Sequence, residues 1–313
     1  METPMSLQSA RHPDPVDPIF RGLAFAAATT LLLTLGGLIV ALMIGGWPAI
    51  SKFGFGFLTS STWNPVTEVY GAAGPIVGTL ITAVLSLTIA LPIAVCVSVF
   101  LTQYCPKQIA QPVSTAIELL AGIPSIVYGM WGLFVFAPWF ARTVQLPILT
   151  SLDPESFWGK LLAGVPNGAN IFTASIVLAI MILPYMSAVF RELFRSIPPQ
   201  VREAAFGLGC TSYEVVGSVL IPYVKKGMIG VVMLGFGRAL GETMAVTFII
   251  GNSHRFPDSL FASGSTLAST IANEFNEASG VHLASLIALG LVLFLITFTV
   301  LAIARALLSS QRY

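Results

Sequence analysis

Long apolar runs separated by short polar segments dominate this chain of 313 residues. Six of these runs reach the roughly 20 residues that a helix needs to cross the hydrocarbon core of a membrane. They cover residues 23–46, 76–101, 113–137, 171–190, 227–251 and 283–304. We therefore expect an all-α integral membrane protein with six transmembrane helices, built as one domain over residues 21–313.

The composition excludes an ordinary soluble fold. The sequence is 55% hydrophobic and only 9% charged, whereas soluble domains carry about 25% charged residues. The net charge of +1 gives no reason to expect a nucleic acid as a partner. The cysteines Cys96, Cys105 and Cys210 are scattered without the spacing of a disulfide framework or a metal site, so we expect no metal.

The distribution of Lys and Arg predicts the orientation in the membrane. If the N-terminus is cytoplasmic, ten basic residues fall on the inner side and four in outer loops, with Arg238 left inside the fifth span. Lys and Arg concentrate in cytoplasmic loops, so both termini and the connection at 196–224 are expected there. Residues 1–20 hold four prolines and mixed charges, which predicts a disordered cytoplasmic tail. The first apolar run is longer than that of a secretory signal, so we expect it to be retained.

Three outer connections are long for simple turns. They cover about 47–75, 138–170 and 252–282. The first is rich in aromatic residues, which is typical either of an interfacial belt or of a docking surface for a soluble partner. Pro92, Pro124 and Pro184 lie inside expected spans and predict kinks. No internal repeat is visible, whereas an inverted repeat would have favoured a secondary transporter.

The connection at 196–224 carries a set of helix signals. Residues 200–208 are mostly good helix formers, and Gly209 is placed to end their helix in a left-handed cap. Thr211 and Glu214 fit a capping box that opens a second helix, and Pro222 is placed to end it. We expect two short helices about Gly209, although a simple amphipathic linker is the alternative.

One arginine lies where a charge is costly. Arg238 is expected roughly 16 Å above the start of the fifth span, near the middle of the membrane, where a charge costs at least about 2.5–3.5 kcal/mol. Glu242 follows four residues later on the same helix face. The two form either an ion pair that fixes helix packing, or an anion site in the substrate path in which Glu242 holds Arg238 or acts in gating. Arginine suits phosphate because its charge is permanent and its fork matches two oxygens.

Glu118 is a third ionisable residue inside an expected span. It lies roughly 8 Å from the cytoplasmic end of that span, so we do not expect it to be level with Arg238. It either reaches the membrane interface or lines the substrate path.

The connection at 196–224 also resembles the coupling loop of ABC-importer permeases, which receives motion from a separate ATPase. The match rests on five positions: Glu203, Ala204, Ala205, Gly209 and Pro222. Two nearby positions depart from the family pattern by conservative apolar exchanges.

Longer strings resemble one family within that class. LLAGIPSIVYGMWGLFVFAP (119–138) and GRALGETMAVTFIIGN (237–252), with shorter matches at WNP and ANEF, resemble the PstC family, the permease subunits of bacterial phosphate ABC importers. The resemblance runs from about residue 20 to 305. It implies a MetI-like type I ABC-importer permease with a cytoplasmic coupling-helix loop, located in the bacterial inner membrane.

The resemblance implies partners as well. They are a second, PstA-like permease, a PstB-like ATPase dimer and a periplasmic, PstS-like phosphate-binding protein. The sequence lacks the G-x-x-x-x-G-K-[ST] phosphate loop, so ATP is expected to be hydrolysed on the ATPase chain, with no cofactor bound here. The chain itself is thus expected to be a transport subunit and not an enzyme, forming with the second permease the path for inorganic phosphate from periplasm to cytoplasm.

Three other functions stay open at this point. A permease for another oxyanion, such as sulfate or molybdate, would have the same architecture. An ion-coupled secondary transporter or channel is disfavoured by the loop and by the missing repeat. A membrane-embedded enzyme is disfavoured because His12, His254 and His282 lie in the tail or beside an outer loop, and no nucleophile–base pair is visible in the spans.

Overall fold

The chain is mostly helical. The computed structural model describes residues 16–310, and the side chains of residues 18–306. In this part of the chain six helical segments are long and apolar enough to cross a membrane, which confirms the predicted fold class. These segments are Pro18–Phe53, Ala73–Tyr104, Ser125–Ser151, Ile171–Arg195, Ser212–Leu240 and Gly280–Ala306.

The N-terminal half contains short elements between its long helices. In chain order they are α1 (Val16–Phe53), α2 (Gly56–Thr59), β1 (Trp63–Asn64), β2 (Val69–Tyr70), α3 (Ala73–Val99), the π-helical turn η1 (Phe100–Tyr104), α4 (Lys107–Ala121), α5 (Ser125–Trp131), η2 (Gly132–Phe136), α6 (Ala137–Phe140), η3 (Ala141–Gln145), α7 (Leu146–Ser151) and α8 (Phe157–Leu161). The strands β1 and β2 form an antiparallel hairpin in which Trp63 faces Tyr70.

The C-terminal half holds the remaining helices. They are α9 (Ile171–Arg195), α10 (Pro199–Gly207), α11 (Ser212–Glu214), the π-helical turn η4 (Val215–Leu220), α12 (Ile221–Leu240), α13 (Met244–Ile249), α14 (Leu267–Glu274) and α15 (Gly280–Ser310). Residues 16–20, which the prediction includes in a tail at 1–20, belong to α1. The rest of that prediction, residues 1–15, lies outside the described residues.

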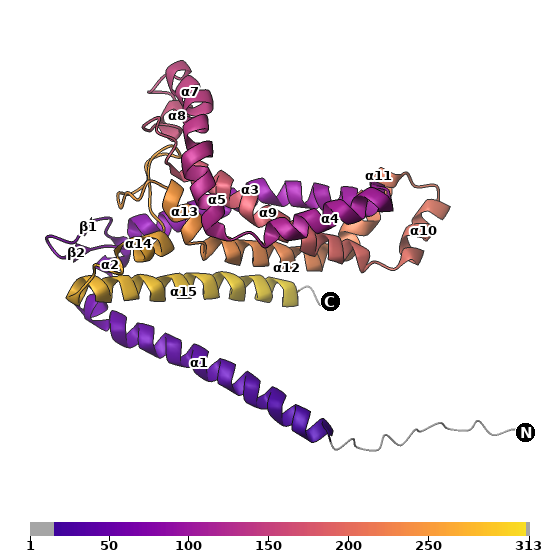
Figure 1. The fold of residues 1–313 in the computed structure, drawn as a ribbon, viewed down its shortest axis with the longest axis horizontal. Coiled ribbons are helices and arrows are strands. Elements are labelled where there is room, and N and C mark those ends of the chain that lie inside the picture. Colours follow the sequence, from indigo (N-terminus) through magenta and orange to yellow (C-terminus); the bar gives the residue numbers. More distant parts are fainter. Residues whose placement is uncertain (1–15, 311–313) are drawn as a thin grey trace, which may run out of the picture.

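The long helices α3, α9 and α12 pack together, with α15 beside α12 and α1 against α15 (Figure 1). The bundle has two ends. We call the end with the β1–β2 hairpin and α14 the hairpin end, and the end with α10 and α11 the loop end. The first turn of α1 and the last turn of α15 point toward the loop end (Figure 1). The segment from α5 to α8 leaves the bundle at a steep angle as an arm (Figure 1).

The apolar side chains form two buried clusters. The larger one surrounds α9, where Ile182, Met186 and Phe190 are fully buried. The smaller one lies at the hairpin end and includes Phe57 and Leu289. Helices in a membrane pack closely where small residues leave room. Accordingly, two glycines of α12 lie against side chains of α9: Gly227 faces Leu193 and Gly235 faces Met186.

The third apolar run is divided between two helices. The predicted span at 113–137 crosses a break at residues 122–124, so that α4 and α5 are separate helices. Pro124 lacks a backbone N–H and disfavours helical geometry in the residue before it, which explains the break. The hydroxyl of Tyr128 donates to the carbonyl of Leu120 at 3.1 Å and bridges the break. Glu118 therefore belongs to α4, outside the spanning segment Ser125–Ser151.

The fifth apolar run is also interrupted. The predicted span at 227–251 ends as a helix at Leu240, and α13 begins at Met244. Gly241 follows the last residue of α12, and glycine is a poor residue for continuing a helix. The fourth span differs by extending to Arg195, beyond the predicted end at 190. Pro92 and Pro184 lie within α3 and α9, which continue past them.

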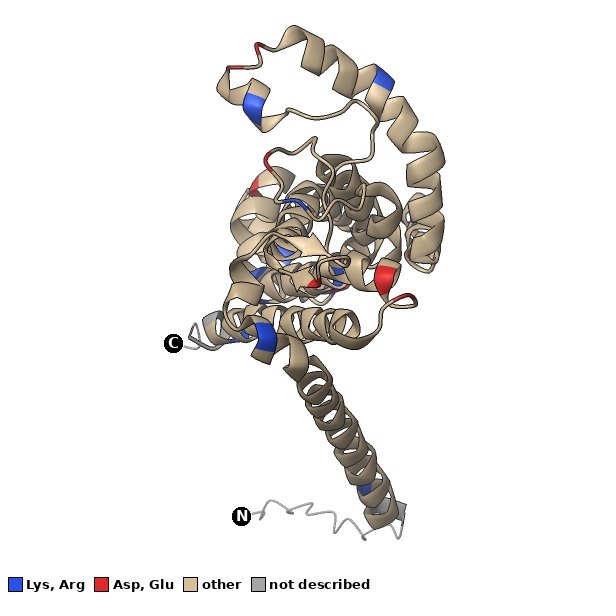
Figure 2. Cartoon of the chain, turned by 90° about the vertical axis from the view of Figure 1, so that its left-hand side faces the viewer, with Lys and Arg blue, Asp and Glu red and all other residues tan. Residues whose placement is uncertain are grey.

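Charged residues are sparse along the helices (Figure 2). In a membrane, apolar side chains contact lipid or another span while charges remain at the ends or face the protein interior. The arm carries residues of both signs near its tip (Figure 2). A charge that lies within the bundle is therefore expected to face a partner or the substrate path.

Candidate functional site

The loop at 196–224 has the shape that its local signals predicted around Gly209. Helix α10 ends at Gly207, and Gly209 has a φ of +86° in the left-handed region. Thr211 then caps the next helix, and its side chain and that of Glu214 form the reciprocal capping box. Because Gly209 tolerates this backbone at no steric cost, the chain reverses between α10 and α11.

Pro222 does not end a helix, contrary to the prediction. It occupies the first turn of α12, and α11, η4 and α12 continue without interruption into the fifth span. A proline cannot donate the i→i−4 hydrogen bond and its ring presses on the preceding turn. The wide π-helical turn η4 lies directly before it, and such turns accommodate a disrupted bonding pattern.

The exposed face of the loop is partly apolar. Glu203 and Ala204 are exposed, whereas Ala205 is buried in the main cluster and packs against the chain itself. Leu208 and Tyr213 are 86% and 82% exposed. Large apolar side chains that gather at one end of a bundle beside charged ones are typical of a protein contact surface. Ala204 therefore lies on the exposed face of the loop, and Ala205 does not.

Arg238 lies in the last turn of α12, with its side chain exposed on this chain. It is twelve residues beyond Lys226 on the same helix, roughly 18 Å along the axis. Its guanidinium carbon lies 5.5 Å from the ring centre of Tyr185 on α9, a distance at which the ring attracts a cation. The C-terminal end of a helix carries partial negative charge, which also stabilises the guanidinium.

The ion pair considered for Arg238 and Glu242 is absent from the described residues. The helix ends between the two residues, so their spacing of four no longer places them on one helix face. Instead, a carboxylate oxygen of Glu242 accepts a hydrogen bond from the backbone N–H of Ala245 at 3.2 Å. This places Glu242 at the positive start of α13, where a carboxylate is stabilised.

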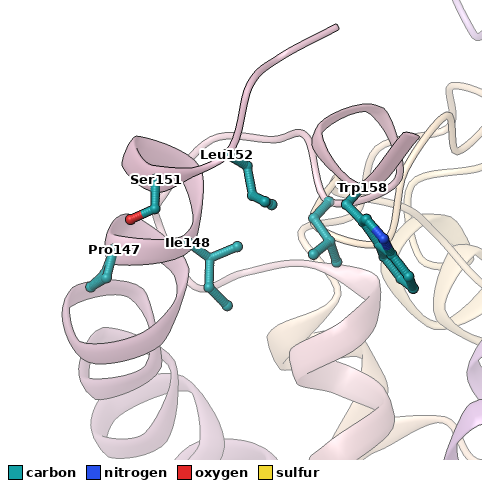
Figure 3. A pocket seen from close by; sticks show the side chains of 6 residues that line it. Pro147, Ile148, Ser151, Leu152 and Trp158 are labelled. Carbon is teal, nitrogen blue, oxygen red and sulfur yellow. The ribbon is translucent and has the colours of Figure 1, made fainter. Parts of the chain in front are cut away.

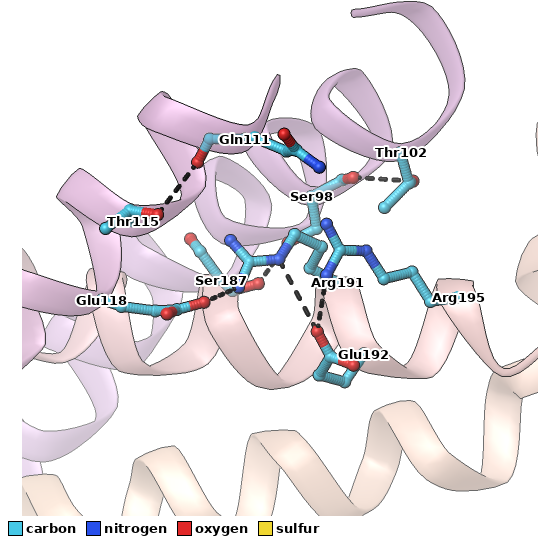
Figure 4. A network of polar contacts seen from close by, with 9 residues as sticks. All are labelled: Ser98, Thr102, Gln111, Thr115, Glu118, Ser187, Arg191, Glu192 and Arg195. Atoms are coloured by element: carbon cyan, nitrogen blue, oxygen red, sulfur yellow. Dashed lines mark hydrogen bonds and ion pairs between the residues drawn. The ribbon is translucent and has the colours of Figure 1, made fainter. Parts of the chain in front are cut away.

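Glu118 forms an ion pair with Arg191, one of the ten basic residues counted on the inner side (Figure 4). Arg191 lies on α9 and is only 2% exposed, while the side chain of Glu118 on α4 is 56% exposed. The Nε of Arg191 lies 3.8 Å from a carboxylate oxygen of Glu192. A buried guanidinium that lost its carboxylate would be strongly destabilising, so Glu118 compensates a buried charge.

A second polar cluster, missed at the sequence level, lies at the hairpin end around Glu274. The Nε2 atoms of His254 and His282 lie 2.8 Å and 2.7 Å from its two carboxylate oxygens. The indole N–H of Trp63 donates to it at 2.9 Å. Tyr70 stacks on His282 with ring centres 5.1 Å apart. The cluster ties the hairpin, the segment after α13, and the ends of α14 and α15 together.

Opposing effects act on the Glu274 carboxyl. Burial raises its pKa, but hydrogen bonds from His254, Trp63 and His282 favour the ionised form and bring the pKa to about 2, from an ordinary 4.5. No local sequence signal could reveal this cluster, because its members come from four segments; Trp63 and Glu274 are 211 residues apart.

A hollow of about 440 Å³ lies on the arm between α7 and α8 (Figure 3). Its lining is formed by Pro147, Ile148, Ser151, Leu152, Trp158 and Leu162. With one hydroxyl and one indole as its polar side-chain groups, this hollow has no charge with which to bind an anion. The described residues contain no group of three or more His, Cys, Asp or Glu arranged to hold a metal ion.

Comparisons with known proteins agree with one another. Residues 94–313 match the family "Binding-protein-dependent transport system inner membrane component". A phosphate transport system permease protein PstC of Mesorhizobium japonicum is 50% identical over 93% of this chain and 90% of its own length. The PstC protein of Pasteurella multocida is 49% identical over 94% of this chain and 92% of its own length.

Solved structures share the fold at low sequence identity. A bacterial alginate ABC transporter crystallised with an alginate-bound periplasmic protein has a chain with a TM-score of 0.59 and 16% identity, covering 92% of this chain and 94% of that chain. The MetNI methionine ABC transporter has one with a TM-score of 0.54 and 17% identity, covering 78% of this chain and 99% of that chain. The family match and the two PstC relatives place this multi-pass inner membrane chain in the binding-protein-dependent transport permeases, as a member of the PstC family.

Proposed function

We propose that this chain is the membrane permease subunit of an ATP-driven importer and forms, with a second permease, the path for inorganic phosphate from periplasm to cytoplasm. The observation that carries the proposal is Arg238. Its guanidinium is exposed on this chain, roughly 18 Å along α12 from Lys226, and belongs to none of the ion pairs of the described residues. A guanidinium without a carboxylate is a binding partner for a tetrahedral anion.

The helix break at residue 241 gives Arg238 and Glu242 separate roles. Since Glu242 is turned to the start of α13, it does not neutralise Arg238, and an anion can approach the guanidinium without displacing a carboxylate. Glu242 is assigned to fixing the position of α13 relative to α12. Glu118 keeps only an indirect role in the path, because it compensates the charge of Arg191.

The loop at 196–224 is assigned the role of contact surface for the ATPase. Its exposed face offers Glu203, Phe206, Leu208 and Tyr213 around the turn at Gly209, a mixture of charge and large apolar groups suited to a protein partner. The chain contains no phosphate-binding loop of its own. ATP is therefore hydrolysed by a separate, PstB-like ATPase dimer, and this chain binds no cofactor.

The distribution of Lys and Arg supports an orientation of the chain in the membrane. Arg191 is buried on α9, so it does not count among the ten basic residues of the inner side. Nine basic residues then remain on the inner side against four in the outer loops, and this excess still favours cytoplasmic termini. The loop end is then cytoplasmic, and the hairpin end and the segment around α8 at the tip of the arm face the periplasm. They would meet a PstS-like phosphate-binding protein.

A second, PstA-like permease is the partner within the membrane. Helix α1 is exposed along its apolar length, with Leu31, Leu32 and Leu33 uncovered. The α5–η2 segment also leaves Phe134 and Val135 exposed. A path needs walls on all sides, and Arg238 is open to the outside of this chain, so the missing wall is assigned to the second permease.

The test is a reconstitution of the complete complex in vesicles with ATP on the ATPase side and the binding protein on the other. Labelled phosphate and labelled sulfate are offered in parallel. ATP-dependent uptake of phosphate, without uptake of sulfate, is expected. Uptake of sulfate, or phosphate uptake that does not require ATP, would overturn the proposal.

A further inference from the structure

Among the described residues, one side-chain hydrogen bond joins the loop helix α10 to the second span. Arg202 precedes the exposed Glu203, yet its own side chain is half-buried. Its Nη1 donates to the amide oxygen of Gln103 at 3.1 Å, across 99 residues of sequence. Gln103 lies in η1, the π-helical turn that ends the second span.

The polar contacts continue from Gln103 into the bundle. The amide nitrogen of Gln103 donates to the hydroxyl of Thr102 at 3.1 Å, and that hydroxyl donates to the carbonyl of Ser98 at 2.8 Å. The hydroxyl of Ser98 donates in turn to the carbonyl of Ser187 on α9 at 2.9 Å. Ser98, Thr102 and Ser187 lie side by side near Arg191 (Figure 4). A connected series of hydrogen bonds thus leads from α10 to α9.

The other attachments of α10 are of a different kind. Ala205 packs into the main apolar cluster, and apolar contacts are non-directional, so they allow one element to slide along another. A hydrogen bond from a guanidinium to an amide oxygen fixes distance and direction. The turn to which it attaches is π-helical, a form that is often found at functional sites and is less regular than α-helix.

We propose that Arg202 is a positioning residue that fixes α10 to the inner end of the second span through Gln103. A displacement of α10 is then passed to the packed pair α3 and α9. Without the bond, α10 moves over the apolar surface while the spans stay in place. This inference rests on the proposed function of the loop as the contact of the ATPase.

The test measures phosphate taken up per ATP hydrolysed by the complete complex in vesicles. Arg202→Ala is expected to leave the ATPase bound and ATP hydrolysis running, while the ratio of uptake to hydrolysis falls about fivefold to tenfold, which matches the net contribution of one ordinary hydrogen bond. Gln103→Ala, which leaves the exposed face of the loop unchanged, should have the same effect. The exchanged pair Arg202→Gln with Gln103→Arg should restore the ratio.

Arg195→Ala is the matched control. Arg195 is an arginine of α9 whose bond goes to Glu192 at 3.0 Å, so its loss should leave the ratio unchanged. If the Arg202 and Gln103 variants both behave like this control, or if Arg202→Ala releases the ATPase in a pull-down, the inference is overturned. If the unsubstituted complex shows no ATP-dependent phosphate uptake, the proposed function has failed instead.

Discussion

Replacing Glu274 by Gln should loosen the hairpin end of the molecule. Gln keeps the size of the side chain but removes the charge, and its amide group is a donor where the carboxylate has only acceptors. Glu274 receives hydrogen bonds from Trp63, His254 and His282, so one of these partners must face a second donor or change its tautomer. The Nδ1 atom of His254 is buried without a hydrogen-bond partner, so a tautomer change would leave an unpaired N–H there.

The lowered pKa of Glu274 gives the size of the expected loss of stability. A fall in pKa from 4.5 to about 2 corresponds to roughly 3 kcal/mol of stability at neutral pH. The side chain remains 20% exposed, and solvent screening reduces the figure. We expect Glu274→Gln to lower the free energy of unfolding by about 2–3 kcal/mol. For a chain of this length, such a loss lowers Tm by about 4–8 °C.

The assay is thermal unfolding of the purified complex, followed by tryptophan fluorescence. Glu277→Gln is the matched control, because Glu277 is an exposed glutamate of the same outer segment, and its Tm should stay within about 1 °C of the parent. Equal Tm values for both variants and the parent would refute the reasoning.

The pH dependence adds a second check. A carboxyl whose folded pKa is depressed contributes stability above its unfolded pKa and loses it as pH falls toward the folded value. Between pH 7 and pH 4 the parent should therefore lose about 1 kcal/mol of this contribution, while the Glu274→Gln variant has no such loss. A difference in Tm that stays constant over this range would contradict an origin in the carboxylate.

Three further predictions concern the path and the loop. Arg238→Ala should abolish phosphate uptake while the complex still assembles, because the guanidinium is the proposed anion contact; wild-type uptake in vesicles would remove it from the mechanism. Gly209→Val should weaken ATPase binding in a pull-down and reduce uptake, since a β-branched residue at a φ of +86° costs about 1–3 kcal/mol; Gly207→Ala, at a helical glycine with open space around it, is the control and should be neutral. Glu118→Gln should lower the free energy of unfolding by about 2 kcal/mol, because Arg191 would keep a buried charge; an unchanged Tm would show that the pair contributes nothing to stability.

The sequence determined the features that depend on neighbours within a few residues. Six apolar runs predicted six spanning segments, because a helix is the structure that satisfies its own backbone in lipid. The left-handed Gly209 and the capping box of Thr211 and Glu214 were predicted correctly, since both are local hydrogen-bonding patterns. The role of Pro222 was predicted wrongly, because the π-helical turn before it lets the helix continue.

Only the tertiary structure decided which charges meet. Arg238 and Glu242 are close in sequence but separate, because the helix ends between them and each charge lies at the end of a different helix. Arg191 and Glu118 are 73 residues apart and pair, and the same holds for Arg202 with Gln103 and for Glu274 with its three partners. The physical reason is that such contacts are set by how helices pack, and the packing of α4 on α9 and of α14 on α15 depends on the whole chain. The apolar pattern determines which segments form helices, whereas the packing of those helices determines which of their few polar groups pair.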